Sequence, residues 1–224
     1  MENFQHRLES EFSTETRLQL VEAVQRAYET AIDSYDTATG SNNSTFGHDL
    51  YWFCVHELKT IAEPEVSQLE LIRERPEFRM RVGSCILACH RVGSDPDQDI
   101  AKSFPKNNRA AGQLARSNFK QLFLPGFEDD DPELNKDIEK LNIVLAHIGN
   151  PHDGVCSVYL CVPIHEENGR IMNWGYTELL WKADGLDLFT YSTRELPEEA
   201  HIEPATVRLK PKKKEEDNKN GGDI

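Results

Sequence analysis

The sequence lacks any apolar run that approaches the roughly 18 residues needed for a membrane-spanning helix. Its first residues, Met1 to Arg7, contain neither the basic segment nor the apolar segment of a secretory signal peptide. From these two absences we predict a cytoplasmic protein that has no membrane partner.

Several motifs of the common enzyme classes are missing as well. There is no Gly-rich phosphate loop, no His-Glu-x-x-His, no Gly-x-Ser-x-Gly, no Cys-x-x-Cys pair and no zinc-finger spacing. We therefore predict no resident cofactor.

The chain has an odd number of cysteines, five, and all lie within apolar stretches: Cys54, Cys85, Cys89, Cys156 and Cys161. This pattern is typical of small buried thiols rather than of a disulfide framework.

Basic residues are scarce relative to acidic ones. The chain has 25 Lys and Arg against 39 Asp and Glu, which gives a formal net charge of −14. Phosphate groups would be repelled by most of such a surface, so nucleic acid is not expected as the main ligand. The acidity favours a basic protein partner instead.

The apolar residues that are present predict three helices. They recur at three- and four-residue spacing, which places them on one helical face, in the segments 13–36, 46–62 and 108–122. Ser13 or Thr14 can cap the first of these helices, and Asn107 or Asn108 can cap the third.

Five further segments read as strands. Alternating or continuous apolar residues, bounded by Gly, Asn and Pro, occur at 78–82, 85–92, 142–148, 155–164 and 170–181. The last three follow one another through short turns, which predicts an antiparallel meander. The segment 69–73 is ambiguous between a short helix and a loop, and 186–191 could add an edge strand.

Together these elements predict a single α+β domain over residues 1–200. We expect an antiparallel sheet of about five strands, formed by a hairpin and the C-terminal meander, with the N-terminal and central helices covering one face. Residues 201–224 are polar and lose all periodicity. They cannot bury enough apolar surface to offset their ordering entropy, so we predict a disordered C-terminal tail.

A first candidate site surrounds the turn that follows residue 148. His147, His152 and Asp153 offer two imidazoles and a carboxylate, which are groups suited to metal ligation or to acid and base catalysis. The alternative is that residues 150–154 form a simple turn, with Asp153 bonded to the local backbone and His147 in a strand.

A second candidate site is a local reversal of charge. Residues 102–120 contain five basic residues and no acidic one. If a helix starts near residue 108, its free amides would form an anion-binding site with the neighbouring side chains of Lys106, Asn108, Arg109 and Arg116. The alternative is a surface helix whose basic face pairs with the acidic segment 126–139.

The sequence therefore favours a non-catalytic protein-interaction or regulatory protein. One such role is the acidic neutralising or accessory subunit, an antitoxin, of a bacterial toxin or phage-defence pair, hence a role in antiviral defense. The alternative is an enzyme, a small metal-dependent phosphodiesterase or nuclease. It would use His147, His152 and Asp153 with the cations Lys106 and Arg109. A small-molecule sensor with a pocket between sheet and helices is a third possibility.

Overall fold

The computed structural model describes residues 4–63, 68–75, 77–105, 109–123, 140–165 and 172–183, all within one compact unit. The helices in these segments are α1 (Phe4–Glu11), α2 (Thr14–Asp33), α3 (Asn43–Ala62) and α4 (Arg109–Phe123), with short 3-10 helices η1 (Thr37–Thr39) and η2 (Ile100–Lys102). The strands are β1 (Leu69–Arg73), β2 (Arg79–Val82), β3 (Cys85–Gly93), β4 (Leu141–Asn150), β5 (Gly154–His165) and β6 (Met172–Lys182). The tail predicted at 201–224 and the strand considered at 186–191 lie outside the described residues.

The helix starts follow the capping residues that the sequence provides. Ser13 precedes α2, and its hydroxyl accepts a hydrogen bond from the Thr16 amide at 3.1 Å. Asn42 precedes α3 and forms a capping box with Thr45.

In the described segments, no helix combines the length and the apolarity that crossing a membrane requires.

The strands form one six-stranded sheet in the order β1-β2-β3-β4-β5-β6. All neighbours pair antiparallel except β3 and β4, which run parallel with Cys89 opposite Leu145. The α+β class is confirmed, and the sheet is mixed but mostly antiparallel. The parallel pair was not predicted. It arises because the chain between β3 and β4 crosses over through η2 and α4 before it re-enters the sheet.

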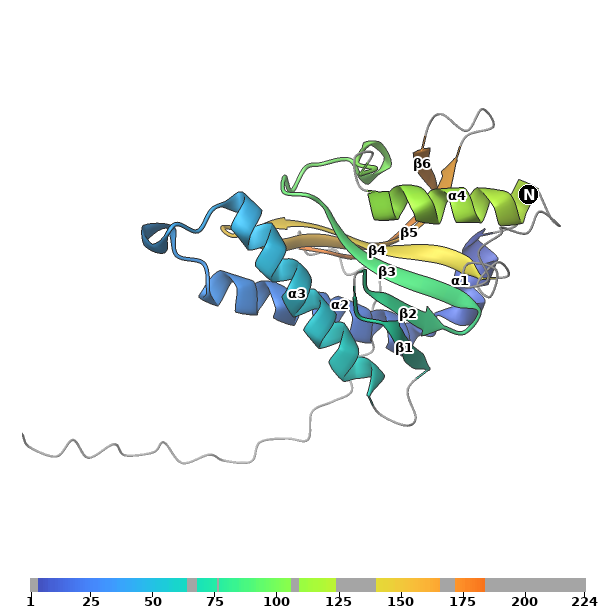
Figure 1. Ribbon diagram of the computed structural model, residues 1–224, viewed down its shortest axis with the longest axis horizontal. Helices are drawn as coiled ribbons and strands as arrows, with labels where there is room; N and C mark the ends of the chain where they lie inside the picture. Colours follow the sequence, from blue (N-terminus) through green and yellow to red (C-terminus); the bar gives the residue numbers. More distant parts are fainter. Residues whose placement is uncertain are drawn as a thin grey trace, which may run out of the picture. The chain divides into compact units, whose positions relative to one another are not determined.

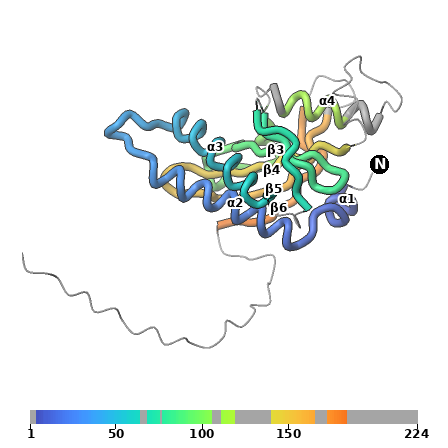
Figure 2. The backbone as a smooth tube through the Cα atoms, turned by 60° about the horizontal axis from the view of Figure 1, so that its bottom comes forward, coloured from blue at the N-terminus to red at the C-terminus, as the bar shows by residue number. Residues whose placement is uncertain are grey.

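Helices cover both faces of the sheet (Figure 1). On one face, α1, α2 and α3 pack against side chains such as Leu87, Ile143 and Leu145. On the other, α4 packs against Val144 and Ala146. Figure 2 shows the strands between α4 and the α2–α3 pair from a second direction. The prediction placed all helices on one face; the structure differs because α4 belongs to the crossover.

Coverage of both faces explains why β4 is almost continuously apolar. Every residue from Leu141 to Gly149 is buried. A strand that is buried on one side only would alternate apolar and polar residues, whereas a strand between two layers need not. The position of β4 at the centre of the sheet therefore accounts for the strongest apolar run in the sequence.

Candidate functional site

Three side chains with metal-ligating or nucleophilic atoms meet on the α1–α3 face of the sheet. Cys89 and His147 come from the neighbouring parallel strands β3 and β4, where His147 lies opposite Arg91, two residues beyond Cys89. Side chains two positions apart on a strand share a face. Helix α3 packs against this face and adds Cys54. All three are buried, with exposed fractions of 0% for Cys54 and 2% for each of the others.

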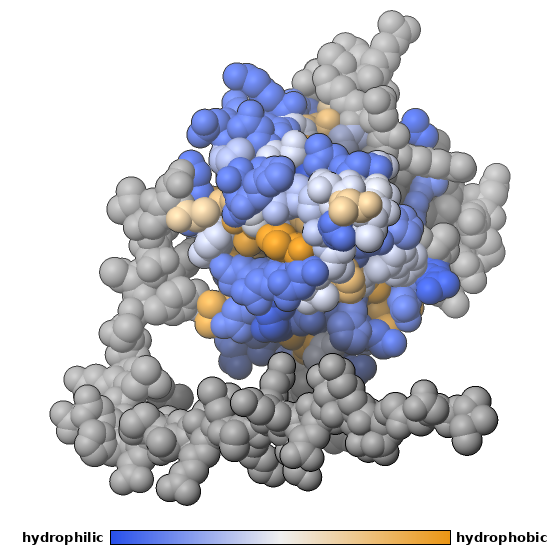
Figure 3. All heavy atoms as spheres, turned by 90° about the vertical axis from the view of Figure 1, so that its left-hand side faces the viewer, coloured by the Kyte–Doolittle hydropathy of each residue, from blue (hydrophilic) through white to orange (hydrophobic). Residues whose placement is uncertain are grey.

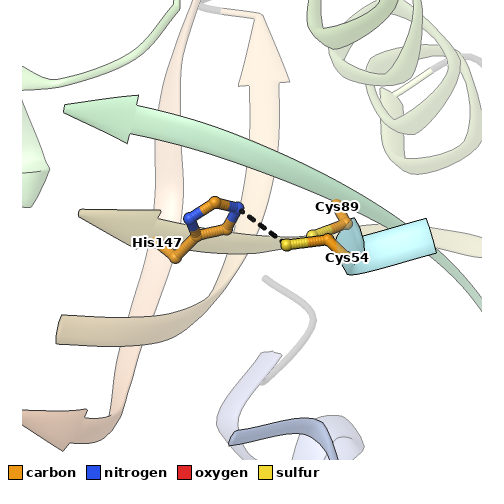
Figure 4. A group of neighbouring side chains, drawn as sticks. All are labelled: Cys54, Cys89 and His147. Atoms are coloured by element: carbon orange, nitrogen blue, oxygen red, sulfur yellow. Dashed lines mark hydrogen bonds between the residues drawn. The ribbon is translucent and has the colours of Figure 1, made fainter. Parts of the chain in front are cut away.

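The reactive atoms of this group, which we call the Cys2His cluster (Cys54, Cys89 and His147), point toward one another (Figure 4). The two Sγ atoms and a ring nitrogen of His147 all lie within 4.8 Å of one another. The separation between Cys54 Sγ and His147 Nε2 is 3.9 Å. Among the described residues, no other group of three or more His, Cys, Asp or Glu side chains has ligand atoms so arranged.

The two buried thiols of the Cys2His cluster influence each other's pKa. A hydrogen bond with the Cys54 thiol, assisted by His147, holds the pKa of Cys89 below its usual value despite burial. The same hydrogen bond to Cys89, together with burial, raises the pKa of Cys54. Because the two thiols interact, they lose their protons in two coupled steps whose pKa values belong to the pair.

His147 is oriented by a second residue from the helical layer. The Tyr28 hydroxyl and His147 Nδ1 are hydrogen-bonded at 3.0 Å, and the two rings meet edge to face. In the tautomer in which Nδ1 carries the proton, the Nδ1–H group donates a hydrogen bond to the Tyr28 oxygen, and the lone pair of Nε2 faces Cys54. Tyr28 thus occupies Nδ1, and Nε2 is the ring nitrogen on the side of Cys54.

Gly149 makes room for Tyr28. A Cβ atom at this position would lie 2.6 Å from the Tyr28 ring and 2.3 Å from the carbonyl oxygen of Gly154. The Arg91 side chain fixes the same segment, because its Nε donates to the Gly149 carbonyl at 2.9 Å. The β4–β5 hairpin therefore packs closely against Tyr28, the residue that is hydrogen-bonded to His147 of the Cys2His cluster.

The turn residues named from the sequence lie elsewhere. His152 and Asp153 are exposed, while His147 is in the core. Asn150 closes the turn: its Oδ1 accepts from the amides of both residues, and its Nδ2 donates to Asp153 Oδ2 at 2.8 Å. The structure thus brings His147 to two cysteines and does not bring it into one metal-binding group with His152 and Asp153.

The predicted anion site falls mostly outside the described part of the chain. Lys106 and Asn108 are not described, and of Arg109 only the backbone is, as the first residue of α4. Arg116 is exposed on α4. The acidic segment 126–139 also lies outside the described residues. The anion site, and with it the phosphodiesterase alternative, stays a prediction.

A separate feature lies on the outer surface of α2. Exposed side chains at helical spacing form one row that we call the α2 acidic stripe: Glu15, Leu18, Glu22, Glu29 and Asp33. Leu18, 37% exposed, is one of two large exposed apolar side chains in the described part of the chain. Arg26 falls in the same row, but its guanidinium is engaged by Glu57 at 2.7 Å and by Glu22 at 3.8 Å.

The face of the molecule at the α2–α3 connection is largely hydrophilic (Figure 3). Figure 3 views the molecule from the side of the α2–α3 connection, where hydrophilic residues surround a small apolar area. Comparison of the chain with protein-family models, curated proteins and solved structures gives no match.

Proposed function

We propose that this protein is a non-catalytic regulatory protein that binds a basic protein partner through the α2 acidic stripe. The observation that carries the proposal is the combination on this stripe of four exposed carboxylates with an exposed leucine. The carboxylates supply long-range attraction, and the leucine supplies an apolar anchor for the contact itself.

The distribution of ion pairs supports the stripe as the docking surface. The positive charge of Arg26 is offset by Glu57 of α3, which lies outside the row, at 2.7 Å. The formal charge of −14 gives the rest of the molecule the same sign. A basic partner would accordingly be attracted from a distance and would associate faster at low ionic strength.

The burial of the Cys2His cluster supports a non-catalytic role. Its side chains are at most 2% exposed, so a substrate in solution has no direct access to them. Catalytic groups normally line a cleft that substrate can enter. Within the proposed class, the charge of the protein fits the neutralising subunit of a basic toxin or nuclease in a bacterial defence pair.

Reversal of charge on the stripe tests the proposal. The triple variant Glu15→Lys/Glu22→Lys/Glu29→Lys should bind the partner recovered with the tagged wild-type protein at least about tenfold more weakly, since several attractive contacts become repulsive. Binding is measured by titration at two salt concentrations. The wild-type affinity should fall as salt rises.

A matched control carries the same change of net charge away from the stripe. Asp49→Lys/Glu63→Lys/Asp97→Lys alters exposed carboxylates outside α2 and should retain most of the affinity. Crosslinks from the partner to α2 would add support. Equal loss in both triple variants, or a recovered partner that is acidic, would refute the stripe as the docking surface.

A further inference from the structure

We propose that Cys54, Cys89 and His147 bind one thiophilic divalent metal ion, for which Zn²⁺ is the natural probe, inside the core between α3 and the sheet. Such an ion has a structural role, and its binding does not depend on a partner at the α2 acidic stripe. The donor set, the spacing of the donor atoms, the charge balance and the contact that orients the histidine all support such an ion.

The donor atoms are those that zinc prefers. Thiolate sulfur and imidazole nitrogen are its usual protein ligands, at about 2.3 Å and about 2.1 Å. The cluster contains these two kinds of donor and no carboxylate. Harder ions such as Mg²⁺ and Ca²⁺ take oxygen ligands and are disfavoured here.

The spacing is close to what three of the four ligands of a tetrahedral ion require. Those bond lengths place sulfur about 3.6 Å from nitrogen and the two sulfurs about 3.8 Å apart. Cys54 Sγ and His147 Nε2 are 3.9 Å apart, and no pair in the cluster exceeds 4.8 Å. Small rotations of the side chains are enough to bring all three atoms to an ion at their centre.

Charge balance allows the ion to be fully buried. Two thiolates and a neutral imidazole carry two negative charges, which a divalent ion neutralises. A buried charge without compensation is strongly unfavourable, whereas a neutral centre avoids most of this cost. Binding releases the two thiol protons to solvent, and no redox step or other co-reactant is involved.

The hydrogen bond to Tyr28 provides the support that metal-binding histidines usually have. A ligating histidine commonly donates its other ring N–H to an oxygen, which fixes the tautomer and the ring orientation. Tyr28 OH lies 3.0 Å from Nδ1 and leaves Nε2 toward the sulfurs. Because the ligands come from α3, β3 and β4, an ion would tie the helical layer to the centre of the sheet.

The test measures metal in the full-length protein under reducing conditions. After loading with Zn²⁺ and removal of excess ion, elemental analysis should find about one zinc per chain. Replacement by Co²⁺ should give visible bands of a tetrahedral ion and a near-ultraviolet thiolate charge-transfer band. Chelation of the zinc should lower the thermal midpoint, because the ion binds the folded state only.

Conservative variants separate this site from nonspecific binding. Cys89→Ser and Cys54→Ser should each weaken zinc binding by at least about tenfold, and Tyr28→Phe by about tenfold with unchanged stoichiometry. Cys161→Ser is the matched control: its thiol is also buried, but it packs with the α4 side of the sheet, and this variant should bind zinc as the wild type does.

Three outcomes would overturn the proposal. One is folded, reduced wild-type protein that retains no stoichiometric zinc and gives no charge-transfer band with Co²⁺. Another is Cys89→Ser with wild-type zinc affinity. The third is a Cys54–Cys89 disulfide in protein that was alkylated at lysis, since oxidised sulfurs do not ligate zinc as thiolates. The Co²⁺ spectrum of the wild type decides the matter even if a serine variant fails to fold.

Discussion

Asn118 joins α4 to two strands from a fully buried position. Its Nδ2 donates to the carbonyl oxygens of Asn142 and Pro163, both at 2.8 Å. Its Oδ1 accepts from the Asn142 amide at 2.8 Å and from Asn142 Nδ2 at 3.0 Å. The Asn118 side chain therefore provides hydrogen-bond partners for backbone groups of β4 and β5 that are buried beneath α4.

Replacement of Asn118 by alanine should destabilise the protein strongly. Asn118→Ala leaves several buried polar groups unsatisfied, and each costs about 1–3 kcal/mol. We expect the free energy of unfolding to fall by about 3 kcal/mol, measured by urea titration. Gln113→Ala, an exposed change on the same helix, should stay within about 0.5 kcal/mol of wild type. Similar values for the two variants would contradict this account.

The residue types of the Cys2His cluster predicted the burial of its thiols but not which side chains meet. The cysteines were predicted as buried thiols, and all five are buried and outside any disulfide. His147 was singled out, but for a group with His152 and Asp153. That Cys54, Cys89 and His147 meet could not be read from spacing, because they come from a helix and two strands far apart in the chain. The position of Cys54 on the inner face of a predicted helix was the available signal.

At the scale of elements, local patterns gave good predictions. The predicted helices 13–36, 46–62 and 108–122 correspond to α2, α3 and α4. The short helix α1 was not predicted, because in its eight residues Leu8 alone is buried and no apolar periodicity develops. Segment 69–73, which was ambiguous, forms the edge strand β1, where pairing with β2 decides its conformation.

The start of α3 offers a test of local stabilisation. Asn42 Oδ1 accepts from the Ser44 amide at 2.9 Å and from the Thr45 amide at 3.3 Å, and the Asn42 amide donates to Thr45 Oγ1 at 2.8 Å. Asn42→Ala should lower the free energy of unfolding by about 1 kcal/mol.

The neighbouring residue serves as the control for the cap. Asn43 is exposed at the first position of the helix, so Asn43→Ala should change stability by less than about 0.5 kcal/mol. Both variants are compared by chemical denaturation. Equal stability of Asn42→Ala and wild type would show that the capping box contributes nothing measurable.

At the scale of the whole molecule, Arg17 connects both ends of the described chain. It is 8% exposed, and its guanidinium donates to the carbonyl oxygens of Phe12 at 2.8 Å and Leu8 at 2.9 Å. It also forms an ion pair with Glu178 of β6. One side chain therefore joins α1, α2 and the last strand.

Removal of this charge should cost far more than removal of a surface arginine. Arg17→Met leaves Glu178 and two carbonyls without this partner, and we expect a loss of about 3 kcal/mol in unfolding free energy. Arg26→Met, at a side chain that is 43% exposed, should cost less than about 1 kcal/mol. The double variant Arg17→Met/Glu178→Gln should lose less than the sum of its single changes, and strict additivity would argue against the coupling.

The sequence by itself determined the α+β class, most helix and strand positions and the burial of the thiols. These properties depend on periodicity, turn residues and capping over short segments, which are local features of a chain. Only the tertiary structure decided that β3 and β4 run parallel, that α4 covers the second face, and that Cys54, Cys89 and His147 share one site. Those outcomes depend on which distant segments bury the most apolar surface together. The hydrophobic effect is non-directional, so the apolar pattern of one segment does not identify the segment that packs against it.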